Sequence, residues 1–147
     1  MTQTHQPVDH APRTPNRSIA PRTPEQHLRT VLAANATLSA AAGVAGLVAA
    51  DRLTESMGLG DPTVMQVVSA ALLFFAAAVA WVATRSDKLA AHALAISVCD
   101  IAWVVATVVV VAVTDLTTFG LVVAAISAIG VADFAIAQLW LRRKLAA

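Results

Sequence analysis

The most informative segment of the chain runs from Leu89 to Val113 and reads LAAHALAISVCDIAWVVATVVVVAV. Asp100 is its only residue with a formal charge at pH 7. A helix of about 20 apolar residues is long enough to cross the hydrocarbon core of a bilayer. Leu, Ile and Val each favour insertion by about 0.3–0.6 kcal/mol, and their sum here outweighs the cost of about 2.5–3.5 kcal/mol for one aspartate. The segment therefore predicts a transmembrane helix.

Three further apolar segments of similar length flank this one. They cover approximately residues 30–50, 64–84 and 119–141. The short links between segments favour antiparallel neighbours, and they lie at residues 51–63, 85–88 and 114–118. The whole sequence is 58% hydrophobic and 13% charged, with a mean hydropathy of +0.71, which excludes an ordinary soluble domain. We therefore expect an all-α fold, a four-span transmembrane helix bundle in residues 27–147.

The first 26 residues differ from the rest in composition. They hold five of the six prolines and too few apolar side chains to build a core, so we expect a disordered, proline-rich cytoplasmic tail at residues 1–26. Near its end, Thr23, Pro24 and Gln26 form the pattern of a helix start. Threonine takes the N-cap, proline takes the first helical position, and glutamine follows three residues after the cap.

Several classes of function are excluded by composition. A net charge of +1 gives no basis for binding nucleic acid. The single cysteine, Cys99, forms no internal disulfide and no multi-cysteine metal site. Haem ligated by two histidines is also disfavoured, because His92 is the only histidine inside a span. We therefore expect no cofactor, no metal and no enzymatic activity.

The basic residues are distributed unevenly between the two ends of the predicted helices. Nine of the ten would lie at one end: Arg13, Arg17, Arg22, Arg29, Arg85, Lys88, Arg142, Arg143 and Lys144. Only Arg52 falls at the other end. Because basic loops are retained on the cytoplasmic side, this pattern predicts a multi-pass protein of the plasma (inner) membrane with both termini in the cytoplasm.

Small residues form stripes on two of the predicted helices. In the first span the stripe recurs at helical spacing and consists of Asn35, Ser39, Ala42, Gly43 and Gly46. In the fourth it repeats every four residues as Gly120, Ala124, Ala128 and Ala132. Small side chains allow close approach of helices in lipid, so we expect both stripes at helix contacts, with the first helix inside the bundle.

The candidate functional residues are polar groups inside the spans. We predict a seam made of Asp100, Asp133, His92, Trp103 and Asn35. The two aspartates have similar predicted depths and would share a proton if their helices face each other. The indole of Trp103, one turn from Asp100, would donate to its carboxylate. Two interpretations stay open: a proton or substrate path with His92 near its entrance, or a structural network in which the acids bond to partners such as Asn35 and hold the helices in register.

Several residues resemble those of a family of small, uncharacterised four-helix bacterial integral membrane proteins. The matching positions are Arg29, Asn35, Gly43, residues 58–62 (GLGDP), residues 99–103 (CDIAW) and Gln138. The chain also looks distantly like DoxX-type four-helix proteins, some of which act as membrane subunits of redox assemblies. The resemblance implies a membrane location and a four-helix fold, and no reaction.

Two classes of function follow from these expectations. The first is a non-enzymatic structural or partner-binding membrane module, with the lipid bilayer and either a second copy or a membrane partner subunit as its partners. The second is a small oligomeric proton-coupled transporter that uses Asp100 and Asp133. Small multidrug transporters, which are similar in size alone, carry a glutamate in the first helix, where this chain has Asn35.

Overall fold

The computed structural model describes residues 22–146, and all of its regular secondary structure is helical. The helices are α1 (Pro24–Val48), α2 (Ala50–Met57), α3 (Pro62–Arg85), α4 (Leu89–Val113) and α5 (Thr118–Ala146). In the described part of the chain, four of them, all except α2, are long and apolar enough to cross a membrane. The predicted all-α bundle with four spans is confirmed. The predicted disorder concerns residues that lie mostly outside the described part.

The starts of α1 and α3 follow from local capping. Thr23 caps α1 by accepting a hydrogen bond from the Gln26 backbone, while the Gln26 side chain accepts one from the Thr23 backbone. This capping box confirms the predicted helix start. At α3, the Asp61 carboxylate accepts a hydrogen bond from the Thr63 backbone N–H at 2.8 Å. That bond and the nearby Thr63 hydroxyl lower the pKa of Asp61 below its ordinary value of 3.8.

One element was not predicted. Residues 51–63 were predicted only as a link between spans, but the first part of this link belongs to the short helix α2, which ends at Met57 and has Gly58 as its C-cap. Gly58 adopts a left-handed conformation with φ 78°, which glycine reaches without a Cβ clash. The backbone N–H of Thr117 and its hydroxyl donate to the carbonyls of Met57 and Ser56. The end of α2 is therefore attached to the start of α5.

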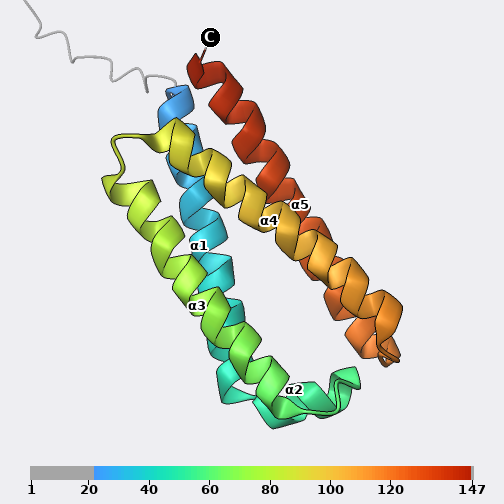
Figure 1. Cartoon of the computed structure of the whole chain (residues 1–147). Helices are drawn as coiled ribbons and strands as arrows, with labels where there is room; N and C mark the ends of the chain where they lie inside the picture. Colours follow the sequence, from blue (N-terminus) through green and yellow to red (C-terminus); the bar gives the residue numbers. More distant parts are fainter. Residues whose placement is uncertain (1–21, 147) are drawn as a thin grey trace, which may run out of the picture.

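The four long helices associate as two closely packed pairs. α1 packs along α3, and α4 packs along α5, while α1 also contacts α5. α3 and α4 meet mainly near their short link and diverge towards the α2 end (Figure 1). The main apolar cluster lies near the ends of the helices that carry the two termini, and it includes Leu28, Leu32, Val79, Ile96 and Leu141. The bundle is therefore tightly packed at one end and more open at the other.

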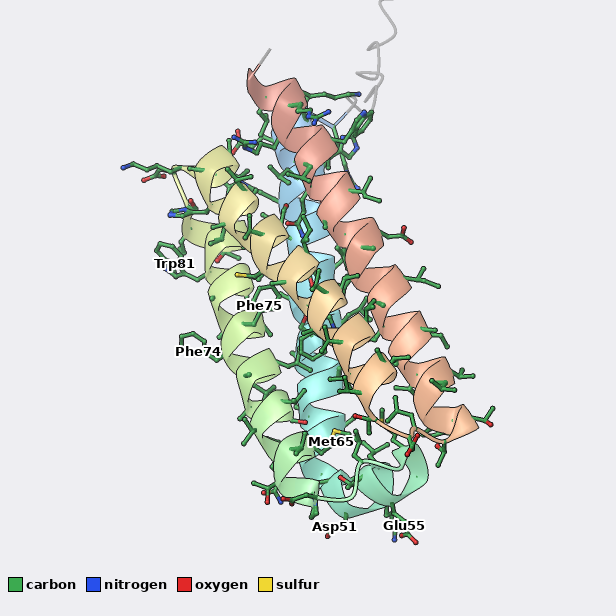
Figure 2. All side chains as sticks on the ribbon, turned by 45° about the vertical axis from the view of Figure 1, so that its right-hand side comes forward. Asp51, Glu55, Met65, Phe74, Phe75 and Trp81 are labelled. Atoms are coloured by element: carbon green, nitrogen blue, oxygen red, sulfur yellow. The ribbon has the colours of Figure 1, made fainter. Side chains whose placement is uncertain are left out.

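The outer surface is apolar, as expected for helices in lipid. Phe74 is 80% exposed and Val48 is 83% exposed. Figure 2 shows Phe74 and Trp81 directed away from the bundle, whereas Phe75, next to Phe74, is directed into the space between the helices. Asp51 and Glu55 lie on α2 at the opposite end from the termini (Figure 2). This distribution matches a multi-pass membrane protein with polar ends.

Candidate functional site

Asp100 is the centre of the candidate site and lies in the middle of α4. Its side chain is 2% exposed. The Asn35 amide on α1 donates to Asp100 Oδ1 at 3.3 Å and to Oδ2 at 3.0 Å. The Gln138 amide on α5 donates to Oδ2 at 3.0 Å. One carboxylate thus connects three helices, and the predicted contact between Asn35 and Asp100 is confirmed.

Two serines extend these contacts. The Ser39 hydroxyl donates to Asn35 Oδ1 at 3.3 Å, and the Ser97 hydroxyl is 3.0 Å from Gln138 Oε1. We call the resulting set the polar network, and its members are Asn35, Ser39, Ser97, Asp100 and Gln138. Ser39 lies four residues after Asn35, and Ser97 lies three residues before Asp100, so each pair shares one helix face. The two serines therefore donate to the amide oxygens of Asn35 and Gln138, the two side chains that donate to the carboxylate.

No cationic side chain neutralises this carboxylate within residues 22–146. The salt bridge found there joins Arg29 to Glu25, near the N-terminus of α1. Arg29 also donates to the carbonyls of Ala83 and Ser86 at the end of α3, and Arg142 donates to the Ala90 carbonyl. These cations bind backbone groups at the ends of the helices. The amides of the polar network supply hydrogen bonds to Asp100 but no positive charge.

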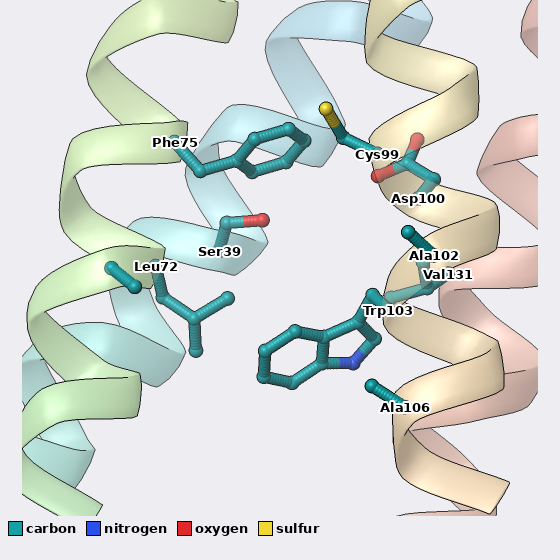
Figure 3. Close-up of a pocket in the computed structure, with 10 residues that line it drawn as sticks. Ser39, Leu72, Phe75, Cys99, Asp100, Ala102, Trp103, Ala106 and Val131 are labelled. Carbon is teal, nitrogen blue, oxygen red and sulfur yellow. The ribbon is translucent and has the colours of Figure 1, made fainter.

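A cavity of about 300 Å³ lies next to the polar network, between the two helix pairs (Figure 3). Asp100 and Ser39 form part of its wall, and the aromatic side chains of Phe75 and Trp103 form another part. Its remaining lining residues are small or aliphatic apart from the thiol of Cys99. Ala71, Ala102 and Ala106 line it and are exposed, so the cavity reaches the surface where α3 and α4 diverge.

One contact predicted for the seam is absent. The Trp103 indole N–H donates to Ser127 Oγ on α5 at 3.1 Å and not to Asp100. His92 also lies apart from Asp100: its Nδ1 is 2.6 Å from Ser86 Oγ, and its ring packs edge to face on Trp81. The Trp103 prediction used position along a single helix. Trp103 turns towards α5 because the neighbouring helix offers a hydroxyl there, and His92 lies two turns nearer the link.

The predicted proton sharing between Asp100 and Asp133 is wrong. Asp133 is exposed on the outer surface of α5, whereas Gln138 on the same helix is fully buried and holds Asp100. The five residues that separate these two positions place their side chains about 140° apart around a helix, at 100° per residue. The rotation of α5 about its axis directs Asp133 outward.

Two members of the polar network were not among the predicted site residues. Gln138 is 0% exposed and Ser97 is 1% exposed. Ser97 shares a helix face with Asp100, and this spacing was a usable signal. Gln138 is a polar amide inside a predicted span, and such a side chain is expected to form a hydrogen bond with a group on another helix. The identity of that partner depends on which helices pack together.

The predicted packing glycines contact different elements: Gly43 and Gly46 lie against α3, and Gly120 lies against the end of α2. A Cβ added at Gly43 would lie 2.8 Å from the Leu73 side chain and 2.9 Å from the Ser69 carbonyl, and one at Gly46 would collide with Ser69. Both glycines therefore allow α1 to approach α3 closely. A Cβ at Gly120 would collide with the Met57 backbone at the end of α2. On the same helix Ala124 is buried and Ala128 is partly buried.

In residues 22–146, no group of three or more His, Cys, Asp and Glu side chains converges in a way that would hold a metal ion. Comparisons with protein-family models, with curated proteins and with solved structures found no significant match.

Proposed function

We propose that this protein is a non-enzymatic module of the plasma (inner) membrane that acts by pairing with a second copy of itself through α5. The observation that carries the proposal is the position of Asp133. Its carboxylate is exposed on the outer face of α5, and it lies nine residues before Arg142, or about 14 Å along the helix axis at 1.5 Å per residue. That depth is within the hydrocarbon core.

An exposed carboxylate at this depth is costly in lipid. Insertion measurements assign about 2.5–3.5 kcal/mol to an aspartate at the centre of a helix. A partner helix that covers Asp133 would remove it from lipid and supply hydrogen bonds. Within residues 22–146, no side chain forms a hydrogen bond with Asp133, and a second copy would supply such a partner.

A second copy suits this face for reasons of symmetry and shape. A two-fold axis along the membrane normal places the two Asp133 side chains at equal depth, where one shared proton links two carboxyl groups. Gly130 lies one turn away, and a Cβ added there would meet nothing within 4 Å. Gly130 therefore leaves an uncovered space on the same helix, which allows close approach of another helix. Ile129 and Ile136, 64% and 66% exposed, supply apolar contact on either side.

The polar network has a structural part in this proposal. Its hydrogen bonds join α1, α4 and α5, which holds α5 in the rotation that directs Asp133 outward. The alternative of a transporter that uses both aspartates together is not supported by their opposite placements. Both termini are proposed to be cytoplasmic. The end of the bundle at which α1 begins and α5 ends also carries the basic residues Arg29, Arg85 and Lys88.

The test is the oligomeric state of the full chain in lipid nanodiscs, measured by native mass spectrometry and by single-molecule photobleaching at low density. We expect a dimer for the native chain. Asp133→Leu and Gly130→Leu should give monomers, because one removes the polar contact and the other blocks close approach. Ala78→Leu, at an exposed site on α3, is the control that adds the same side chain elsewhere in the membrane.

Three results would contradict the proposal. One is a dimer that persists in both the Asp133→Leu and the Gly130→Leu variants. Another is a native chain that is monomeric at high density in nanodiscs. The third is a stoichiometric partner of different mass that Asp133→Leu releases, which would keep the α5 face as an interface and reject the second copy as its occupant.

A further inference from the structure

We propose that the cavity beside Asp100 is a binding site for a small, monovalent organic cation of the alkylammonium or arylalkylammonium class. The inference does not depend on dimer formation, because Asp100 lies inside the bundle and Asp133 lies on the outer surface of α5. It rests on the chemistry of the cavity wall, on the charge of the residues around it and on its position in the membrane.

The wall of the cavity combines one carboxylate with two aromatic rings. Asp100 supplies a negative charge, while Phe75 and Trp103 supply ring faces that attract organic cations. Figure 3 shows these three side chains facing the same space, Phe75 from α3 and the other two from α4. A cation placed there would interact with the carboxylate on one side and with aromatic rings on others.

Within residues 22–146, no cationic side chain contacts Asp100. Its oxygens accept three hydrogen bonds, one at Oδ1 and two at Oδ2, all from neutral amides. Two carboxylate oxygens offer about four acceptor positions, so one position on Oδ1 stays available for an ammonium N–H. A buried carboxylate is stabilised by an adjacent positive charge, which a monovalent cation would supply.

A metal ion fits this cavity poorly. Hard cations such as Ca²⁺ and Mg²⁺ require about six or more oxygen ligands, whereas the polar oxygen groups in the wall are those of Ser39 and Asp100. The remaining wall is apolar and aromatic, which suits the hydrocarbon part of an organic ligand. A volume of about 300 Å³ is at the small end of ligand sites, which span about 300–1,000 Å³.

The position of the cavity indicates how the ligand arrives. Asp100 lies twelve residues after Lys88, or about 18 Å along α4 at 1.5 Å per residue. Lipid headgroups lie outside the hydrocarbon core and do not reach this depth. The exposed rim residues Ala71, Ala102 and Ala106 open the cavity between α3 and α4. A ligand with an apolar body can therefore reach the cavity through the opening between α3 and α4.

The test compares a charged ligand with a neutral molecule of the same shape. Phenethylammonium and propylbenzene differ only by an ammonium group in place of the terminal methyl group. Binding of each to the full chain in nanodiscs is measured by equilibrium dialysis with mass-spectrometric quantification, and empty nanodiscs correct for partitioning. We expect saturable, stoichiometric binding of the cation to the native chain and at least tenfold weaker binding of the neutral molecule.

Variants then identify the groups responsible. Asp100→Asn should weaken cation binding at least tenfold, and Asp87→Asn, which removes the same charge from an exposed link, should leave it unchanged. Phe75→Leu and Trp103→Leu keep the carboxylate and should each weaken cation binding by about threefold to tenfold through loss of a cation–π contact. These two variants decide the question if Asp100→Asn fails to fold, as checked by circular dichroism and size-exclusion chromatography.

Four outcomes would overturn the assignment. The native chain could fail to bind the cation, or it could bind the neutral molecule equally well, which would indicate an apolar hole without charge selection. Equal cation affinity in the native chain and in a folded Asp100→Asn variant would also exclude a role for the carboxylate. If Asp100→Asn does not fold, unchanged affinity in both aromatic variants has the same meaning.

Discussion

Gln138 shows how a single side chain holds the centre of this bundle together. It is fully buried, donates to Asp100 at 3.0 Å and accepts from Ser97 at 3.0 Å. Loss of the side-chain amide leaves the carboxylate with one amide partner. In a medium without water, the groups released by such a loss find no replacement partner. Gln138 therefore contributes to stability through the partners that it satisfies.

We expect Gln138→Leu to lower the free energy of unfolding by about 1–2 kcal/mol, the range for strong hydrogen bonds between membrane helices. The measurement is reversible unfolding in mixed micelles with increasing dodecyl sulfate, followed by circular dichroism. Gln66→Leu makes the same chemical change at an exposed position in α3 and should alter stability by less than about 0.5 kcal/mol. Equal effects of the two variants would show that the hydrogen bonds of Gln138 contribute nothing.

The start of α5 illustrates how close contact between elements depends on glycine. A Cβ added at Gly120 would lie 2.5 Å from the Met57 carbonyl oxygen and 3.1 Å from the Met57 Cα. Those atoms belong to the backbone at the end of α2, so they cannot rotate away as a flexible side chain would. Gly130 lies ten residues later on the same helix, and a Cβ added there would meet no atom within 4 Å.

The two glycines therefore form a matched pair. Gly120→Ala should destabilise the bundle by about 1–3 kcal/mol, as overpacking does, because α2 and α5 must separate. In detergent in which the chain is monomeric, Gly130→Ala should not lower stability and should raise it by up to about 1 kcal/mol, because alanine favours a helix over glycine. Thermal unfolding in the same detergent compares them directly. The attachment of α2 to α5 would be refuted by a Gly120→Ala protein as stable as Gly130→Ala.

The whole molecule has chemically different ends. The end of the bundle at which α1 begins and α5 ends carries most of the arginines and lysines. The opposite end carries four acidic residues and one arginine: Asp51, Glu55, Asp61, Asp115 and Arg52. Trp140 lies at the basic end with Lys144 Nζ 3.6 Å from its ring centre. Aromatic and basic side chains together are typical of the interface between lipid and water.

This asymmetry predicts the orientation of the chain in the membrane. In a Cys99→Ser background, Glu55→Cys should react with a membrane-impermeant maleimide added to intact spheroplasts. Asp87→Cys should react only after the membrane is permeabilised, because positive loops are retained in the cytoplasm. The reverse labelling pattern would place both termini outside. Labelling of both cysteines in intact spheroplasts would contradict the arrangement of four spans.

Local sequence was sufficient for much of this protein. The apolar lengths predict four spans, the pattern at Thr23, Pro24 and Gln26 predicts the start of α1, and the buried acid in α4 predicts a polar partner such as Asn35. Each of these follows from hydrogen bonding and burial along one helix or from the exclusion of unpaired polar groups from lipid. Such constraints are visible before the helices pack.

Only the tertiary structure decided which faces meet. In the packed bundle, Gln138 is the second hydrogen-bond partner of Asp100, and the Trp103 indole donates to Ser127. Asp133 lies on the outer surface, and residues 50–57 form α2. In a soluble helix, one apolar stripe marks the side that faces the core. In lipid, apolar residues surround the helix on all sides, so its rotation is set by close contacts such as Gly46 against Ser69 and by the pairing of buried polar groups.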